Sequence, residues 1–98
     1  MKWNFEGKVV VVTGASRGIG EATVRQFDDG GANVVLVSRS TDKLNAIADE
    51  LNNDSLVVDC DLSADLSIDL IRDRTIERFQ KIDILINNAA IERNEPAH

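Results

Sequence analysis

The most regular feature of the chain is a set of short runs rich in valine, isoleucine and leucine. These runs are Val9–Val12, Asn33–Val37, Ser55–Val58 and Ile82–Ile86. The first consists of valine alone, which is typical of a strand buried on both faces. We therefore predict a β-strand at each of the runs.

Apolar residues recur at helical spacing between the first two runs. Val24 and Phe27 give an apolar face to a helix that we predict over about Gly18–Asp29. Gly30 and Gly31 follow, and glycine is favoured just after the last turn of a helix. We expect the helix to end there.

Two more helices are predicted in the remaining intervening segments. The second helix has apolar residues at i, i+3, i+4 and i+7, namely Leu44, Ile47, Ala48 and Leu51. Ser40 or Thr41 can cap its start, and Asn52–Asp54 interrupts it. For the third helix we expect Ser63 as the N-cap and one face marked by Ile68, Ile71, Thr75 and Phe79.

The alternation gives the order β-α-β-α-β-α-β, which predicts an α/β fold with a parallel sheet and right-handed crossovers. A Rossmann-type sheet would have the strand order 3-2-1-4, with the first two helices on one face and the third on the other. We interpret residues 1–98 as one dinucleotide-binding domain. Ligands of such sheets bind in the crevice where the strand order reverses, here between the first and fourth strands.

Composition and charge exclude several classes of protein. The net charge is −6, with 17 acidic and 11 basic residues, which argues against binding nucleic acid or an anionic membrane. The single cysteine, Cys60, cannot form an internal disulfide, which fits a cytoplasmic protein, and we interpret it as a small buried thiol rather than a reactive one. We see neither a signal peptide nor a membrane span, and one cysteine with the terminal His98 supplies no metal site.

A glycine-rich turn, Thr13–Gly20, joins the first strand to the first helix. Gly14 and Gly18 permit backbone torsions or close approach that a Cβ would block, and Gly20 allows the helix to pack tightly on the sheet. The free N–H groups at the helix start suit a pyrophosphate. The alternative is a tight connection with no ligand, and we favour the phosphate site because a strand precedes the turn and a helix follows it.

The residues after the second strand bear on the choice of cofactor. An NAD site places an acidic residue there to bind the ribose 2′-OH, but this chain has Ser38 followed by Arg39. A guanidinium can pair with a 2′-phosphate, and Arg17 could close on the same phosphate from the other side. We therefore expect NADP rather than NAD, with two solvated surface arginines as the alternative.

These motifs resemble those of the short-chain dehydrogenases/reductases. The spacing of Gly14, Gly18 and Gly20 is similar to the glycine motif of that family, and Asn87-Asn88-Ala89-Ala90 resembles its Asn-Asn-Ala-Gly motif, with Ala90 in place of glycine. Cys60-Asp61-Leu62 resembles its adenine-contact motif, and the start of the chain is similar to β-ketoacyl-ACP reductases.

The resemblance implies a set of cofactor-binding positions. They are Gly14, Ser16, Arg17, Gly18, Ile19, Gly20, Ser38, Arg39, Asp61, Leu62, Asn87 and Ala89. Asp61 would accept from the adenine amino group unless it is only a turn residue, and Leu62 would pack near the ring. Asn87 would reach the adenosine ribose through its carbonyl, while Gln80 stands where the family often has a helix-stopping glycine.

The catalytic part of the family pattern is missing. The family uses a Tyr-x-x-x-Lys pair for proton transfer, but this chain has no tyrosine, so we assign no catalytic residue. We expect the chain to stop before the later strands, which would expose an apolar patch and leave the fourth strand as an open edge that invites self-association or a partner chain. Three hypotheses follow: the front part of an NADP-dependent reductase, which we favour; a free-standing NADP(H) sensor; and an interaction module.

Overall fold

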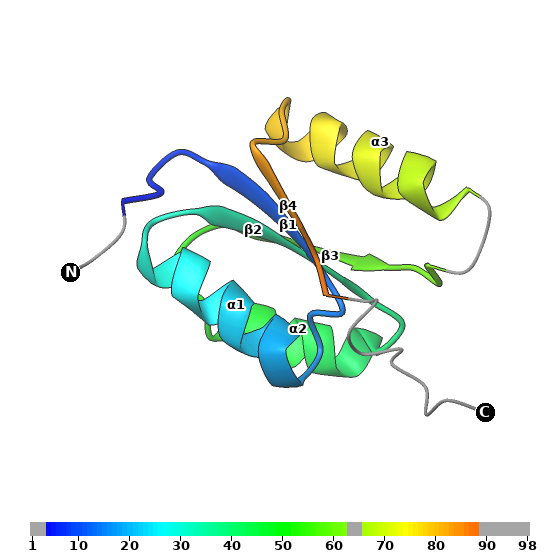
Figure 1. Ribbon diagram of the computed structural model, residues 1–98, viewed down its shortest axis with the longest axis horizontal. Helices are drawn as coiled ribbons and strands as arrows, with labels where there is room; N and C mark the ends of the chain where they lie inside the picture. The colour runs from blue at the N-terminus through cyan, green and yellow to red at the C-terminus, as the bar shows by residue number, and fades with distance from the viewer. Residues whose placement is uncertain (1–3, 63–65, 89–98) are drawn as a thin grey trace.

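The computed structural model describes residues 4–62 and 66–88, and within them the elements alternate as predicted (Figure 1). They are β1 (Val9–Thr13), α1 (Gly18–Asp29), β2 (Asn33–Ser38), α2 (Thr41–Asp49), β3 (Ser55–Asp59), α3 (Ser67–Phe79) and β4 (Ile84–Asn87). Each of the first three strands runs one residue past its predicted end. The order β-α-β-α-β-α-β is therefore confirmed.

The strands form one parallel sheet in the order β3-β2-β1-β4. Val10 of β1 aligns with Val34 of β2 on one side and with Ile84 of β4 on the other. The predicted strand order is confirmed. It places the reversal of strand order, where sheets of this type bind their ligands, between β1 and β4.

Helices α1 and α2 cover one face of the sheet and α3 covers the other (Figure 1). Val10 and Val12 of β1 face the first pair of helices, while Val9 and Val11 face α3, and each of these four side chains is at most 1% exposed. Burying a valine side chain fully contributes about 1.5–3 kcal/mol. The exposed apolar patch that we predicted therefore does not include β1, because β2, β4 and the helices enclose it.

Among the described strands, the predicted exposure falls on β4, which forms one edge of the described sheet. Ile84 and Ile86 pack against the core beneath α1 and α2. Leu85 aligns with Val11, so it points to the α3 side of the sheet, where it is 60% exposed. The apolar side chain left open on this strand is therefore Leu85.

Helix α3 buries a narrower face than predicted. Ser67, Ile71 and Thr75 are buried at successive i, i+4 positions, whereas Ile68 is 64% exposed, so its assignment to the buried face is wrong. The Thr75 hydroxyl donates to the Ile71 carbonyl at 2.7 Å, which satisfies it inside the core. The proposed cap, Ser63, lies outside the described residues.

The helix ends depend less on hydroxyl caps than the sequence suggested. Ser40 occupies the N-cap of α2, but its side chain makes no capping bond, and the Thr41 hydroxyl donates to the Asp59 carboxylate instead. Helix α3 is capped by Gln80, whose backbone is left-handed (φ 68°) and whose N–H donates to the Ile76 carbonyl at 2.8 Å. A glutamine thus takes the conformation that glycine usually provides.

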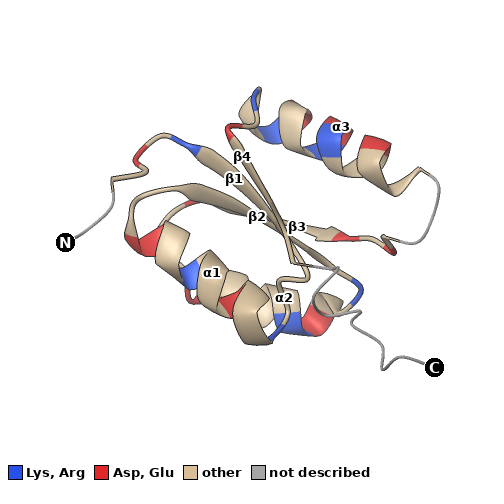
Figure 2. Cartoon of the chain, viewed as in Figure 1, with Lys and Arg blue, Asp and Glu red and all other residues tan. Residues whose placement is uncertain are grey.

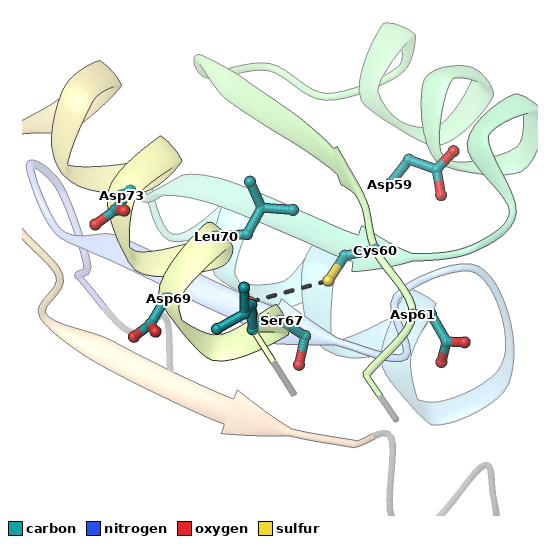
Figure 3. A pocket seen from close by; sticks show the side chains of 8 residues that line it. Asp59, Cys60, Asp61, Ser67, Asp69, Leu70 and Asp73 are labelled. Atoms are coloured by element: carbon teal, nitrogen blue, oxygen red, sulfur yellow. Dashed lines mark hydrogen bonds between the residues drawn. The ribbon is translucent and has the colours of Figure 1, made fainter. Parts of the chain in front are cut away.

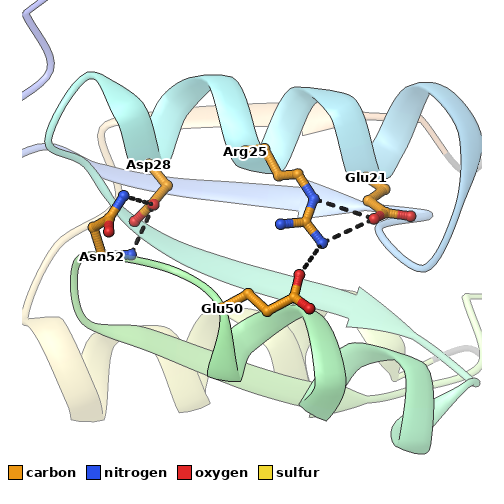
Figure 4. Close-up of polar contacts among 5 residues, drawn as sticks. All are labelled: Glu21, Arg25, Asp28, Glu50 and Asn52. Carbon is orange, nitrogen blue, oxygen red and sulfur yellow. Dashed lines mark hydrogen bonds and ion pairs between the residues drawn. The ribbon is translucent and has the colours of Figure 1, made fainter.

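Charged residues lie on the helices and at strand ends (Figure 2). Asp28, on α1, differs from the others in that its side chain is buried. Its carboxylate accepts hydrogen bonds from the backbone N–H group of Asn52 at 2.8 Å (Figure 4) and from that of Asn53 at 2.9 Å. Two residues predicted only to break a helix therefore also fasten the end of α1 to the loop before β3. Hydrogen bonds to a charged group contribute about 1.5–3 kcal/mol each.

Figure 4 also shows a second link between α1 and the end of α2. The Arg25 guanidinium pairs with Glu50 at 2.7 Å and with Glu21 at 3.0 Å. These bonds raise the pKa of Arg25. Because the groups are partly exposed, we expect the pairs to contribute less than the buried Asp28 contacts.

Strand β4 begins later than predicted because of Asp83. Its carboxylate accepts the Val9 N–H at 2.8 Å, and its own N–H donates to the Val9 carbonyl at 2.9 Å. A side chain therefore takes the place of a strand carbonyl, and the ladder starts at Ile84. The Val9 bond, followed by the pairing with Lys81 at 3.1 Å, lowers the pKa of Asp83.

This lowered pKa predicts a pH dependence of stability. A carboxyl group whose pKa is lower in the folded state stabilises above its unfolded value of 3.8, and its contribution is lost as pH falls through the folded value. We expect chemical denaturation to show that the wild-type chain is more stable than Asp83→Asn at neutral pH, and that the difference shrinks below pH ~4. Parallel stability curves for the two chains would contradict the assignment.

Candidate functional site

The glycine turn leaves β1 at its carboxyl end and enters α1. Gly14 and Gly18 have φ values of 63° and 60°, in the left-handed region where glycine carries no steric penalty. The Ala15 N–H donates to the Val37 carbonyl at 3.2 Å, which ties the turn to β2. The sequence-based reason for both glycines is confirmed.

Gly20 serves packing rather than backbone torsion. A Cβ at this position would lie 1.8 Å from the Gly14 carbonyl oxygen and 2.7 Å from its carbon. At Gly18, in contrast, an added Cβ would meet nothing within 4 Å. The start of the helix is therefore pressed against the turn at Gly20, while the turn is open beside Gly18.

The start of α1 can accept an anion. Arg17 is the N-cap residue, and its side chain makes no capping bond, so it leaves the first N–H groups of the helix uncapped. Ser16 is buried, whereas Arg17 and Ile19 are exposed. Free N–H groups, the positive end of the helix dipole and open space together fit a dinucleotide pyrophosphate.

Beside this turn lies a pocket of about 250 Å³ at the ends of β1 and β2. It is lined by Ser16, Arg17, Ser38, Arg39, Ser40 and Lys43. The prediction that the two arginines approach one ligand position from different segments agrees with this placement. The Ser40 N–H donates to the Ser38 hydroxyl at 3.0 Å, which shapes the turn between β2 and α2.

Lys43 was missed by the sequence reasoning. It belongs to the first turn of α2, which starts at Thr41, and it lines the same pocket as both arginines. The signal was present, because a basic residue just after the second strand lies at the ligand end of a Rossmann-type sheet. Three cations thus surround a space that can hold one phosphate.

The predicted adenine contacts lie at the end of β3. The Cys60 N–H donates to the Ser38 carbonyl at 3.0 Å, which holds the ends of β2 and β3 together. Asp61 pairs with Arg39 at 3.6 Å between Oδ2 and Nη1. Leu62 packs against the core beneath α3, so its role at an adenine ring stays a prediction.

Two asparagines mark the end of β4. The Thr13 hydroxyl donates to Oδ1 of Asn87 at 2.9 Å, so the Asn87 side chain joins β4 to β1. Asn88, to which we gave no role, is 5% exposed, and its Nδ2 has no hydrogen-bond partner among the described residues. A buried unpaired donor costs about 1–3 kcal/mol, which suits a polar partner at this end of the sheet. The predicted contact at Ala89 lies outside the described residues.

A second pocket, of about 530 Å³, lies between the end of β3 and α3 (Figure 3). Cys60 is buried beside it, and burial, followed by the neighbouring Asp61 and Asp59, raises the pKa of its thiol. The interpretation as a buried thiol is confirmed, and a raised pKa disfavours the reactive thiolate. Figure 3 shows Asp69 and Asp73 on α3, and both pair with Arg72.

Two other classes of site find no support in the described part of the chain. Residues 4–62 and 66–88 contain no group of three histidine, cysteine, aspartate or glutamate residues that could hold a metal ion. No helix in these ranges is long and apolar enough to cross a membrane.

The glycine turn at the carboxyl end of the first strand, facing the reversal of strand order, defines a nucleotide-binding α/β protein of the Rossmann type. Residues 8–98 match the short chain dehydrogenase family, and the chain belongs to this family.

Relatives of this family share both sequence and fold with the chain. An uncharacterized oxidoreductase of Staphylococcus epidermidis is 45% identical over 82 residues, which are 84% of this chain and 36% of that protein. The 3-ketoacyl-(acyl-carrier-protein) reductase of Brucella melitensis, complexed with NADH, is 36% identical with a TM-score of 0.79 over 84% of this chain and 34% of its own. The L-sorbose reductase of Gluconobacter frateurii, complexed with NADPH and L-sorbose, is 32% identical with a TM-score of 0.79 over 87% of this chain and 34% of its own. The chain therefore spans about a third of the length of these relatives.

Proposed function

We propose that this chain is the NADP(H)-binding part of a short-chain dehydrogenase/reductase. The observation that carries the proposal is the pocket at the end of β2, which we call the basic pocket because Arg17, Arg39 and Lys43 line it. Ser38 stands there in place of the acidic residue of an NAD site. A carboxylate there would repel a 2′-phosphate, whereas a guanidinium pairs with it. Relatives of the same fold hold NADH or NADPH, so the side chains of this pocket decide the preference.

A bound nicotinamide dinucleotide supplies the hydride for the chemistry of the family. The chain's own residues hold it: the turn from Gly14 to Gly20 and the start of α1 take the pyrophosphate, and the basic pocket takes the 2′-phosphate. Asp61 and Leu62 flank the adenine, and Asn87 lies at the ribose end of the crevice. We place all these contacts at the carboxyl ends of parallel strands, where Rossmann-type sheets bind their ligands.

We further propose that this chain by itself does not catalyse hydride transfer. The family mechanism needs a tyrosine as general acid, and the sequence contains none. We also infer a cytoplasmic location, because a single buried cysteine requires no oxidising compartment.

A fluorescence titration of the chain with NADPH and, in parallel, with NADH tests the proposal. Saturable binding that favours NADPH is the expected result, and it should come without oxidation of NADPH when a carbonyl substrate is added. Equal affinity for the two cofactors would overturn the assignment of the basic pocket. Steady turnover by this chain would overturn the proposal that it lacks catalytic machinery.

An exposed edge supports a second role, self-association or binding of a partner chain through β4. Leu85 is 60% exposed on a strand at the edge of the described sheet, and such edges pair with other chains. We expect the wild-type chain to sediment as a concentration-dependent oligomer and Leu85→Lys to shift it towards monomer. Gln26→Lys, which adds the same charge to the exposed side of α1, is the matched control. A wild-type chain that stays monomeric at high concentration would rule this role out.

A further inference from the structure

Arg39 belongs to two sites at once. Arg39 lines the basic pocket together with Arg17 and Lys43, and its guanidinium pairs with the Asp61 carboxylate at 3.6 Å. The hydrogen bond from the Cys60 N–H to the Ser38 carbonyl fixes the strand ends that carry Arg39 and Asp61. Asp61 therefore holds a fixed negative charge beside the cation that a 2′-phosphate would need.

The ion pair is weak enough to exchange. The side chains of Arg39 and Asp61 are 74% and 47% exposed, and exposed pairs of this kind are readily separated. A phosphate carries more charge than a carboxylate and offers more oxygen acceptors to a guanidinium. A ligand with a 2′-phosphate would therefore compete with Asp61 for Arg39.

We propose that Asp61 tunes cofactor selectivity by competing with the 2′-phosphate for Arg39. This inference rests on the proposed NADP(H) site, and it gives Asp61 a role separate from any contact with adenine. A ligand without a 2′-phosphate leaves the pair intact. A ligand with one takes Arg39 from Asp61. Because the ion pair is lost, the 2′-phosphate then adds less to the affinity of the ligand than it would without Asp61.

Two small probes isolate this effect. Adenosine 2′,5′-bisphosphate and adenosine 5′-monophosphate differ only in the 2′-phosphate. We define the ratio as the affinity for the bisphosphate divided by the affinity for the monophosphate, both measured by calorimetry at fixed ionic strength. Any change in binding of the adenine cancels in this ratio. Asp61→Asn should raise the ratio about twofold to fivefold, the range expected for an exposed ion pair.

The control variants separate competition from a general change in charge. Asp59→Asn removes the same charge from a neighbouring carboxylate that accepts from the Thr41 hydroxyl, and it should leave the ratio nearly unchanged. In an Arg39→Gln background, Asp61→Asn should have no effect on the ratio. An equal rise in that background would overturn the competition and indicate simple repulsion of the phosphate.

The remaining outcomes distinguish this inference from the proposed function. A wild-type ratio above one that Asp61→Asn does not change overturns the tuning role alone. A ratio of one in both the wild-type chain and Asp61→Asn overturns the tuning role and the proposed preference for NADP(H) together.

Discussion

Replacing Gly20 with alanine is expected to destabilise the chain more than the same replacement at any other glycine of the glycine turn. The new Cβ would lie 1.8 Å from the Gly14 carbonyl oxygen, which is backbone and cannot rotate away. Overpacking of a rigid site costs about 1–3 kcal/mol and sometimes more. We expect a loss at or above ~3 kcal/mol, a large part of the marginal stability of a small domain.

Gly18→Ala is the matched control for this prediction. Its Cβ would enter open space, so it carries only the penalty of a left-handed backbone, about 1–2 kcal/mol. Urea denaturation measures the free energy of unfolding of both variants. It thereby compares the steric clash in Gly20→Ala with the torsional strain in Gly18→Ala, two residues away. The higher helix propensity of alanine acts in the opposite direction and would stabilise Gly20→Ala. If this variant were as stable as the wild-type chain, the close contact of α1 with the turn would be refuted.

The second large effect is expected at Arg39. Arg39→Asp replaces a cation in the basic pocket with a carboxylate, one residue after Ser38, which stands where NAD-binding folds place the acid that bonds the ribose 2′-OH. Loss of a charge-assisted hydrogen bond costs about 1.5–3 kcal/mol, so NADPH should bind about tenfold to a hundredfold more weakly while NADH binding is kept or improved. Fluorescence titrations with both cofactors measure the change.

Arg74→Asp, an equal change of charge on the exposed surface of α3, should leave both affinities near the wild-type values. An unchanged preference in Arg39→Asp would show that the basic pocket does not bind the 2′-phosphate. A parallel loss of both cofactors would point to damage of the fold, which the urea midpoint would reveal.

Much of the fold could be predicted from sequence because its signals are local and repeated. The valine run of β1 and the i, i+3, i+4, i+7 pattern around Leu44 report burial directly, and the strand order follows from the alternation of elements. The glycines of the turn were equally readable, since each is required by a torsion or a contact within a few residues.

The features that were missed depend on side chains that meet across the fold. The pairing of Arg39 with Asp61 and the bonds of Asp28 to the loop before β3 join segments that periodicity treats separately. Asp83 shortens β4 because its carboxylate, in place of a backbone carbonyl, accepts the Val9 N–H. Ile68 was wrongly assigned to the buried face of α3. Its spacing from Ile71 shows that it lies near the apolar face of the helix, but spacing along one helix does not show how far the sheet packed against it extends.

The most direct test of the NADP(H) site is an amide NMR titration of the isotopically labelled chain with NADP⁺. The account predicts that the largest shift changes fall on Gly14–Gly20 and Ser38–Lys43, at the carboxyl ends of β1 and β2, and that NAD⁺ perturbs the second segment less. Changes confined to α3 and β4, or no changes at millimolar cofactor, would contradict the account.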